Sequence, residues 1–509
     1  MVVAVSPAQR LDVRMGTPQG RWVLFATVLG SGLAMLDATV VNVALQRIGT
    51  DFGADFTGLQ WTVNAYTLTL ASLILLGGSL GDRYGRRRVF LIGVVWFALA
   101  SLLCGLAPSI ETLIAARALQ GVGGALLTPG SLAIISASFR GSDRSAAIGA
   151  WSGLAGVAGA VGPFVGGWLI GWSWRAVFLV NLPVALVIVA VAARHVPESR
   201  DPDAAPHLDL AGTVLTVVGL AGLTYALTAA GEEGASPTVL AVGAVGVAAL
   251  VAFVQVERRS DHPLVPPVLF ADRQFTAANA VTLLVYAALG VLFVLLVLQL
   301  QVVAGFGPLL AGVALLPITL IMLLFSARVG ALAQRIGPRI LLVAGPLVAA
   351  VGALLMRRIG PGASYVLDVL PPVVVFATGL VLTVAPLTAT VLESAPDRYV
   401  GAASGVNNAI ARAAGLLAVA VVPVAAGLTG TDYTEPAAFG AGFRTAMLIT
   451  AALLVAGALV AWALIRRPLG ARVQPEPAGE AERIPIERCA HCGVGGPPVH
   501  PRDSSAASR

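Results

Sequence analysis

The sequence contains no lysine, only three cysteines and five histidines, and little charge for a chain of 509 residues. All 32 basic residues are arginine, and charged residues make up only 11% of the chain. Without lysine the chain cannot form a P-loop, in which lysine reaches the nucleotide phosphates. Three cysteines do not make a disulfide framework. The sequence has no Ser/His/Asp arrangement for nucleophilic catalysis, so it argues against an enzyme.

Long apolar runs take up most of the chain, which is 57% hydrophobic with a mean hydropathy of +0.87. A helix of about 20 apolar residues crosses the roughly 30 Å hydrocarbon core of a membrane. The sequence therefore predicts an all-α polytopic membrane protein. Fourteen spans are expected, at 22–45, 59–81, 88–107, 112–138, 145–170, 174–194, 208–229, 237–256, 275–301, 309–333, 339–357, 366–393, 399–428 and 443–466.

The arginines predict how the chain is oriented. With a cytoplasmic N-terminus, 25 of the 32 arginines fall in cytoplasmic loops and tails, 5 in external loops and 2 inside spans. Basic residues gather on the cytoplasmic side of membrane proteins. We therefore expect a multi-pass protein of the plasma (inner) membrane with both termini in the cytoplasm. The lipid bilayer is its expected partner, and the basic charge indicates orientation, not nucleic-acid binding.

Two sequence echoes indicate an internal repeat. GSLGDRYGRR at 78–87 aligns without gaps to GALAQRIGPR at 330–339, and SDRSAAIGAWSG at 142–153 resembles PDRYVGAASGVN at 396–407. Internal repeats are a common way of building transporters. The predicted segments are a cytoplasmic tail (1–20), a six-helix bundle (21–195), an inserted helix pair with linkers (196–274), a second six-helix bundle (275–466) and a disordered tail (467–509).

These features resemble a known family. The turn after the second span and the segment LDATVVNVALQ (36–46) in the first are similar to motifs of the major facilitator superfamily, in its fourteen-helix drug:proton antiporter branch (EmrB/QacA-type exporters). The resemblance implies the major facilitator fold, proton-coupled antiport of small amphiphilic compounds by alternating access, and no cofactor besides the proton. We expect the protein to function as a monomer.

The charged turn GGSLGDRYGRRRV (77–89) has two interpretations. Its arginines would satisfy the positive-inside pattern alone, and its glycines allow a tight turn. The resemblance implies a conformational latch between the two bundles, weaker in the second copy, where Gln334 replaces the acid. The latch residues would be Gly78, Asp82, Arg83, Gly85, Arg86 and Arg87.

Three charged residues are predicted deep inside spans: Asp37, Arg117 and Arg412. Intramembrane charge is costly and is a functional hypothesis by default. Asp37 either alternates between protonated and ionised forms or forms a static ion pair with a buried arginine. Arg117 lies on one helical face with Gln120 and Gly121, and either assists proton transfer or binds backbone carbonyls. The resemblance implies proton coupling for Asp37 and Arg117.

Span five carries a glycine-rich face, which by itself indicates close helix packing. Its Gly162-Pro163-x-x-Gly166-Gly167 arrangement resembles the antiporter motif of exporters. Other polar or aromatic side chains are substrate candidates or ordinary interhelical contacts. These are Gln60, Trp61, Asn64, Tyr66, Gln120, Tyr286, Gln299 and Arg412. Cys489 and Cys492 in the tail resemble half a zinc site, but a closed site needs four ligands. No metal site is therefore expected.

The leading functional hypothesis is proton-coupled export of hydrophobic or amphiphilic compounds, as in drug or antibiotic efflux. A dedicated exporter of an endogenous lipid or metabolite would use the same machinery. A membrane sensor that transports nothing is the third hypothesis.

Overall fold

The computed structural model describes residues 13–201, 208–260, 263–396, 399–430 and 435–465. The side chains of 141–142, 145, 152–153 and 155–160 also lie outside this description, as do Cys489 and Cys492. All regular elements of the described residues are helices. The helices of the first half are α1 (Pro18–Phe52), α2 (Phe56–Tyr84), α3 (Arg86–Leu106), α4 (Ile110–Ser138), α5 (Gly141–Ile170), α6 (Ala176–Leu179) and α7 (Asn181–His195).

The inserted pair is α8 (Leu210–Glu233) and α9 (Pro237–Arg259), followed by a short 3-10 helix, Pro267–Ala271. The helices of the second half are α10 (Arg273–Leu298), α11 (Pro308–Val313), α12 (Leu316–Ile336), α13 (Pro338–Met356), α14 (Leu370–Glu393), α15 (Val400–Ala425) and α16 (Pro436–Leu464). Two π-helical turns, Gln299–Val303 and Tyr365–Val369, extend α10 at its end and α14 at its start.

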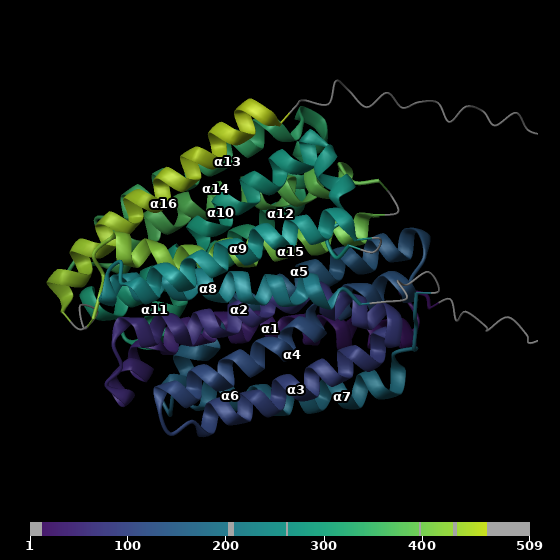
Figure 1. Ribbon diagram of the computed structural model, residues 1–509, viewed down its shortest axis with the longest axis horizontal. Helices are drawn as coiled ribbons and strands as arrows, with labels where there is room; N and C mark the ends of the chain where they lie inside the picture. The colour runs from purple at the N-terminus through teal and green to yellow at the C-terminus, as the bar shows by residue number, and fades with distance from the viewer. Residues whose placement is uncertain (1–12, 202–207, 261–262, 397–398, 431–434, 466–509) are drawn as a thin grey trace, which may run out of the picture. The chain divides into compact units, whose positions relative to one another are not determined.

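The fourteen expected spans are confirmed as helices. Thirteen helical stretches of the described chain are long and apolar enough to cross a membrane. The 30-residue α5 takes the remaining expected position. In Figure 1 the purple and blue helices of the first half lie below the green and yellow helices of the second half, with α8 and α9 between them.

Two spans expected to be continuous are broken, and proline explains both breaks. α6 ends at Leu179, four residues before Pro183, and α11 ends at Val313, four residues before Pro317. A proline cannot donate the N–H that would bond to the carbonyl four residues earlier. The missing bonds therefore fall where α6 gives way to α7 and α11 gives way to α12.

Side-chain caps fix several helix starts. The Thr17 hydroxyl accepts from Gly20 N at 3.1 Å, and Asp55 Oδ1 accepts from Gly58 N at 2.7 Å. Ser109 and Thr112 form a capping box at α4. Such caps satisfy backbone donors that have no partner inside the helix. Polar capping residues therefore set where these helices begin, which the hydropathy pattern alone does not show.

The helix contacts repeat between the two halves. α1 packs on α5, α2 on α4, and α3 on α4 and α7; in the second half α10 packs on α15, α12 on α14, and α13 on α14 and α16. The contacts between the two halves show the same correspondence, in which α2 matches α12 and α5 matches α15. α2 packs on α15, and α5 packs on α12. α8 and α9 pack on each other, and α8 also packs on α2 and α15. The structure is thus two equivalent six-helix bundles with the inserted pair at their seam.

Candidate functional site

The first half buries an ion pair between α1 and α4. Arg117 Nη1 donates to Asp37 Oδ2 at 2.6 Å, and both side chains are at most 1% exposed. The Arg117 Nε also donates to the Thr62 carbonyl on α2, at 3.1 Å. Asp37 and Arg117, singled out from the sequence as intramembrane charges, therefore meet directly. A pair this deeply buried is stable only when its remaining donors and acceptors are also satisfied.

Uncharged side chains complete the Asp37 site. Asp37 Oδ1 accepts from Gln120 Nε2 at 2.8 Å and from Asn181 Nδ2 at 3.0 Å. Both amides also donate to the Ser101 hydroxyl oxygen on α3. Arg117 Nη1 donates to Gln120 Oε1 at 2.5 Å. This Asp37 network joins α1, α3, α4 and α7 through fully buried polar groups.

Aromatic rings lie against the Arg117 guanidinium. Its central carbon lies 4.4 Å from the ring centroid of Tyr66 and 5.8 Å from that of Phe178. Both rings are buried. Cation–π contact supplies about 0.5–2 kcal/mol at such sites. The rings help to hold the arginine in place and keep water from the ion pair.

Sequence reasoning missed Asn181, Ser101 and Phe178. Asn181 is the first residue of α7, at the break caused by Pro183. The signal in the sequence was a polar residue within an apolar span. Ser101 gave no signal, because serine is common in membrane helices. The buried acid Glu257 was also missed. The expected span ended at 256, whereas α9 continues to Arg259 and leaves Glu257 only 4% exposed.

The glycine face of α4 lies against α2. A Cβ added at Gly121 would lie 2.0 Å from Thr69 Oγ1 and 2.3 Å from the Tyr66 carbonyl oxygen. Thr69 Oγ1 donates to the Ala118 carbonyl at 2.8 Å. Close approach through glycine therefore brings α2 and α4 together beside Arg117.

The charged turn 77–89 is held by local contacts. Asp82 Oδ1 accepts from Arg86 Nε at 2.8 Å, and the Asp82 carbonyl accepts from Asp201 N at 3.0 Å. Gly85 has φ +116°, a conformation that favours glycine. The Glu198 carboxylate accepts from Arg87 N at 3.1 Å. The turn therefore binds the segment that follows α7; Gly78 and Arg83 have no described contact across the bundles.

The antiporter motif packs α5 between two helices. A Cβ at Gly162 would lie 2.0 Å from Thr39 Oγ1 on α1, and one at Gly167 would lie 2.5 Å from Leu309 Cα on α11. Gly166 approaches Val40 of α1, and the Pro163 carbonyl approaches Gly312. The glycines of this motif therefore permit backbone contact on both sides.

Three substrate candidates are engaged in helix contacts. Gln60 Nε2 donates to the Val419 carbonyl at 2.8 Å, and Gln299 Nε2 to the Ile359 carbonyl at 2.7 Å. Gln120 belongs to the Asp37 network. Among the described residues, the buried Asn64 amide and Tyr66 hydroxyl have no hydrogen-bond partner. Trp61, Tyr286 and Arg412 are partly exposed.

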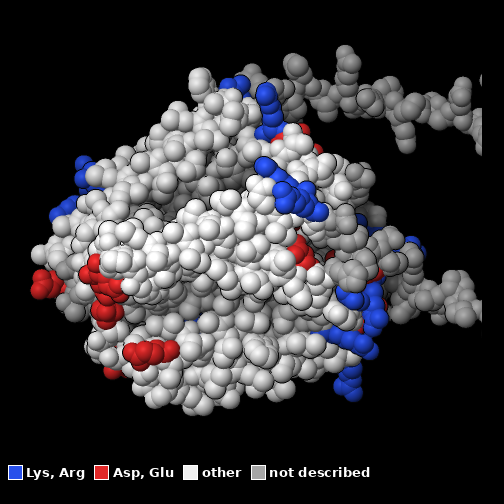
Figure 2. All heavy atoms as spheres, in the orientation of Figure 1, with Lys and Arg blue, Asp and Glu red and all other residues white. Residues whose placement is uncertain are grey.

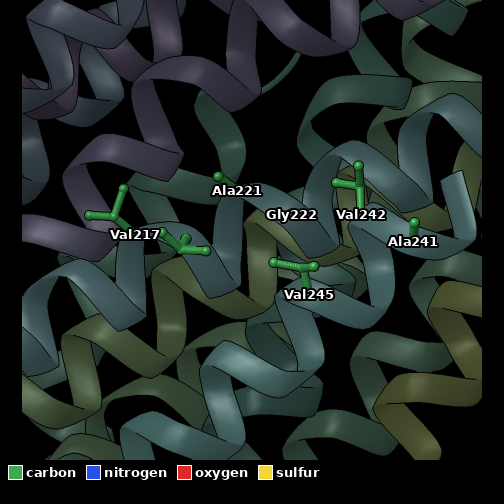
Figure 3. Close-up of a pocket in the computed structure, with 7 residues that line it drawn as sticks. Val217, Ala221, Gly222, Ala241, Val242 and Val245 are labelled. Carbon is green, nitrogen blue, oxygen red and sulfur yellow. The ribbon is translucent and has the colours of Figure 1, made fainter. Parts of the chain in front are cut away.

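An apolar groove lies on the inserted pair, away from these residues. Its volume is about 420 Å³, and it is lined by Val217, Val218, Ala221, Gly222, Ala241, Val242 and Val245. Figure 3 shows these residues along α8 and α9. The groove contains no charged or hydrogen-bonding side chain.

The surface matches a membrane location. Figure 2 shows a broad uncharged belt across the displayed face, with many of the acidic side chains toward one end of the helices and most of the arginines toward the other. Helices long and apolar enough to cross a membrane, two equivalent bundles and a polar network buried within the first bundle define the class. This is the architecture of a multi-pass membrane transporter.

Comparison with known proteins agrees with this class. Residues 27–420 match the Major Facilitator Superfamily, and the chain belongs to that family. It is 37% identical over 446 residues to the puromycin resistance protein pur8 of Streptomyces alboniger, covering 86% of this chain and 88% of the relative. It is also 37% identical over 419 residues to the cephamycin export protein CmcT of Amycolatopsis lactamdurans, covering 81% and 86%.

Solved structures share the fold. A POT family transporter in complex with a thioalcohol-conjugated peptide superposes with a TM-score of 0.66 at 16% identity, covering 89% of this chain and 97% of that one. A bacterial homolog of the human lysosomal transporter Spinster, inward-facing and unoccupied, gives a TM-score of 0.62 at 18% identity, covering 88% and 97%. At these identities the likeness concerns the fold alone.

Proposed function

We propose that the protein exports hydrophobic or amphiphilic compounds from the cytoplasm in exchange for protons. The Asp37 network carries the proposal, because it places a carboxyl group that can bind a proton beside a permanent cation in the membrane interior. The printed functions of the relatives, puromycin resistance and cephamycin export, support export of small compounds.

Protonation of Asp37 would remove the charge that compensates Arg117. A buried guanidinium without a partner is costly, so the protonated network favours a rearrangement that gives Arg117 water or another acceptor. The proton would thereby drive the change between outward and inward access. Entry of one proton supplies about 2.3 kcal/mol per 100 mV of membrane potential.

The contacts between the bundles agree with alternating access. Gln301 Nε2 donates to the Val43 carbonyl at 3.0 Å, Gln60 Nε2 to the Val419 carbonyl, and Phe56 N to the Gly430 carbonyl at 2.8 Å. With the N-terminus in the cytoplasm, these bonds lie toward the external ends of α1 and α2. They would have to break when the transporter opens outward.

The proposal includes the orientation and location of the chain. With a cytoplasmic N-terminus, 25 arginines lie in cytoplasmic loops and tails and 5 in external loops, which supports cytoplasmic termini in the plasma membrane. The Asp37 network lies within one chain, which supports a monomer as the functional unit.

Uptake of a fluorescent amphiphile into inverted vesicles tests the proposal. ATP-energised vesicles that contain the protein should accumulate the compound, and a proton uncoupler should abolish the accumulation. Accumulation that persists with the uncoupler would contradict proton coupling. Absence of transport for a broad panel of compounds would favour a sensor instead.

A further inference from the structure

A third intramembrane charge, Arg412, lies at the centre of the second half. It is the thirteenth of the 26 residues of α15, and Tyr286 is the fourteenth of the 26 residues of α10. Asn407 anchors the two helices by donating to Asn279 Oδ1 at 3.0 Å and to Thr282 Oγ1 at 2.8 Å. One helical turn beyond Arg412, Gly290 and Gly415 bring the same backbones into contact. Contacts between α10 and α15 on both sides of Arg412 along the helix therefore fix its position.

The helix that carries Arg412, α15, packs on both α2 and α10. The Arg412 charge acts electrostatically on the hydroxyl groups of both Tyr66 and Tyr286. Arg117 lies against the same tyrosine, with its guanidinium carbon 4.4 Å from the Tyr66 ring centroid. Tyr66 is therefore close enough to both arginines for each charge to act on it. We call Arg412, Tyr66 and Tyr286 the Arg412 cluster.

The Arg412 cluster has unused hydrogen-bonding groups. Arg412 Nε and the Tyr66 hydroxyl oxygen are buried and have no partner among the described residues. Arg412 itself is partly accessible at mid-helix although α2 and α10 flank it. No described acid forms an ion pair with it, whereas the charge of Arg117 is compensated by Asp37. The centre of the transporter therefore carries one uncompensated positive charge.

We infer that the Arg412 cluster binds the acidic group of an amphiphilic substrate, a carboxylate or a phenolate. This rests on the proposed export function and specifies its substrate class. A guanidinium presents a planar fork of donors that matches a carboxylate, and the two tyrosine hydroxyls supply further donors. The substrate's negative charge would compensate Arg412, so a charge that is costly in the empty transporter favours binding.

Matched probes test the inference: pyrenebutyrate, its neutral amide and the corresponding pyrenebutylamine. Purified protein in liposomes is assayed for transport and for KM. Wild-type protein should transport the acid with a KM at least tenfold below that of the amine, and Arg412→Gln should raise the KM for the acid at least tenfold while changing the amide less than threefold. Arg412→Lys should restore part of the preference. Arg328→Gln, which removes an exposed arginine of α12, is the matched control.

The possible outcomes distinguish a failure of this inference from a failure of the proposed function. Equal losses for acid and amide in Arg412→Gln, or a wild-type preference for the amine, would overturn the inference and leave proton-coupled export intact. Transport of none of the three probes by wild-type protein would instead count against the proposed function. A selective loss of the acid that Arg412→Lys partly reverses supports the inference.

Discussion

At the scale of single residues, the proposed proton coupling depends on the partners of Asp37. The carboxylate accepts from three side chains on α4 and α7, and none of the atoms involved reaches solvent. Removing one member of such a network leaves the others buried without a partner, which costs more than the bond itself contributes. The ion pair should therefore behave as a unit in mutagenesis.

Asp37→Asn alone should destabilise the protein by about 3–5 kcal/mol, since it leaves the Arg117 charge uncompensated in the interior. The double variant Asp37→Asn/Arg117→Gln should recover much of that loss, because it removes both charges together. Thermal unfolding of the detergent-solubilised protein measures the difference. Additive losses in the double variant would show that the two side chains do not depend on each other.

The sequence predicted the charged members of this network but not its uncharged ones. Asp37 and Arg117 stand out because charge is rare inside spans. Ser101 and Asn181 become significant only when α3 and α7 are packed against α1, and a single sequence does not show that packing.

At the scale of helices, glycine determines how closely elements approach. Gly121 allows the α4 backbone to lie against α2 at the level of Tyr66. Gly330, in the second copy of the charged turn, has no atom within 4 Å of an added Cβ. Substituting both positions therefore distinguishes the effect of glycine on helix packing, at Gly121, from its effect on helix propensity, at Gly330.

Gly121→Ala should lower the thermal stability and the yield of folded protein, since its methyl group would overlap the Tyr66 carbonyl. Gly330→Ala should be neutral or stabilising by up to about 1 kcal/mol, because alanine favours helix over glycine. Fluorescence-detected size exclusion after heating compares both variants. Similar behaviour of the two would mean that α2 and α4 tolerate separation.

The turn 77–89 gives a second prediction at this scale. Asp82→Asn should slow transport while substrate binding persists, if the turn acts as a latch. Its direct effect on stability should be at most about 1 kcal/mol, because the Asp82–Arg86 pair is partly exposed. Separate measurements of binding and turnover check this. Unchanged turnover, or a loss of binding as severe as the loss of transport, would argue against a latch.

Helix positions followed from hydropathy, and most boundaries lie within a few residues of those expected. The breaks before Asn181 and Leu316 did not follow, although Pro183 and Pro317 were visible. Prolines 129, 163, 346, 386 and 423 lie inside continuous helices. A proline in a membrane helix therefore kinks or breaks it according to its neighbours, which the sequence does not specify.

At the scale of the whole molecule, we expect the balance of buried charge to limit which substrates are transported. The carboxylate of Asp37 is already satisfied by Arg117, Gln120 and Asn181, and Arg412 adds positive charge. A dication in a low-dielectric site needs about two compensating anions, and each uncompensated charge costs several kcal/mol. We therefore expect its substrates to be neutral, zwitterionic or singly charged amphiphiles.

Resistance assays with matched monovalent and divalent cationic drugs test this limit. Cells that express the protein should gain little protection against the divalent member of each pair. A non-expressing strain provides the baseline for both drugs. Strong protection against the divalent drug that depends on Asp37 would contradict the charge balance.

The most direct test of the account measures proton movement that depends on substrate. In liposomes containing a pH-sensitive dye, a gradient of a transported amphiphile should drive proton flux through the wild-type protein. The flux should persist in the control variant Glu393→Gln, which changes an exposed acid at the end of α14. It should vanish in the folded double variant Asp37→Asn/Arg117→Gln. Proton flux at the wild-type rate in that double variant would contradict the central claim.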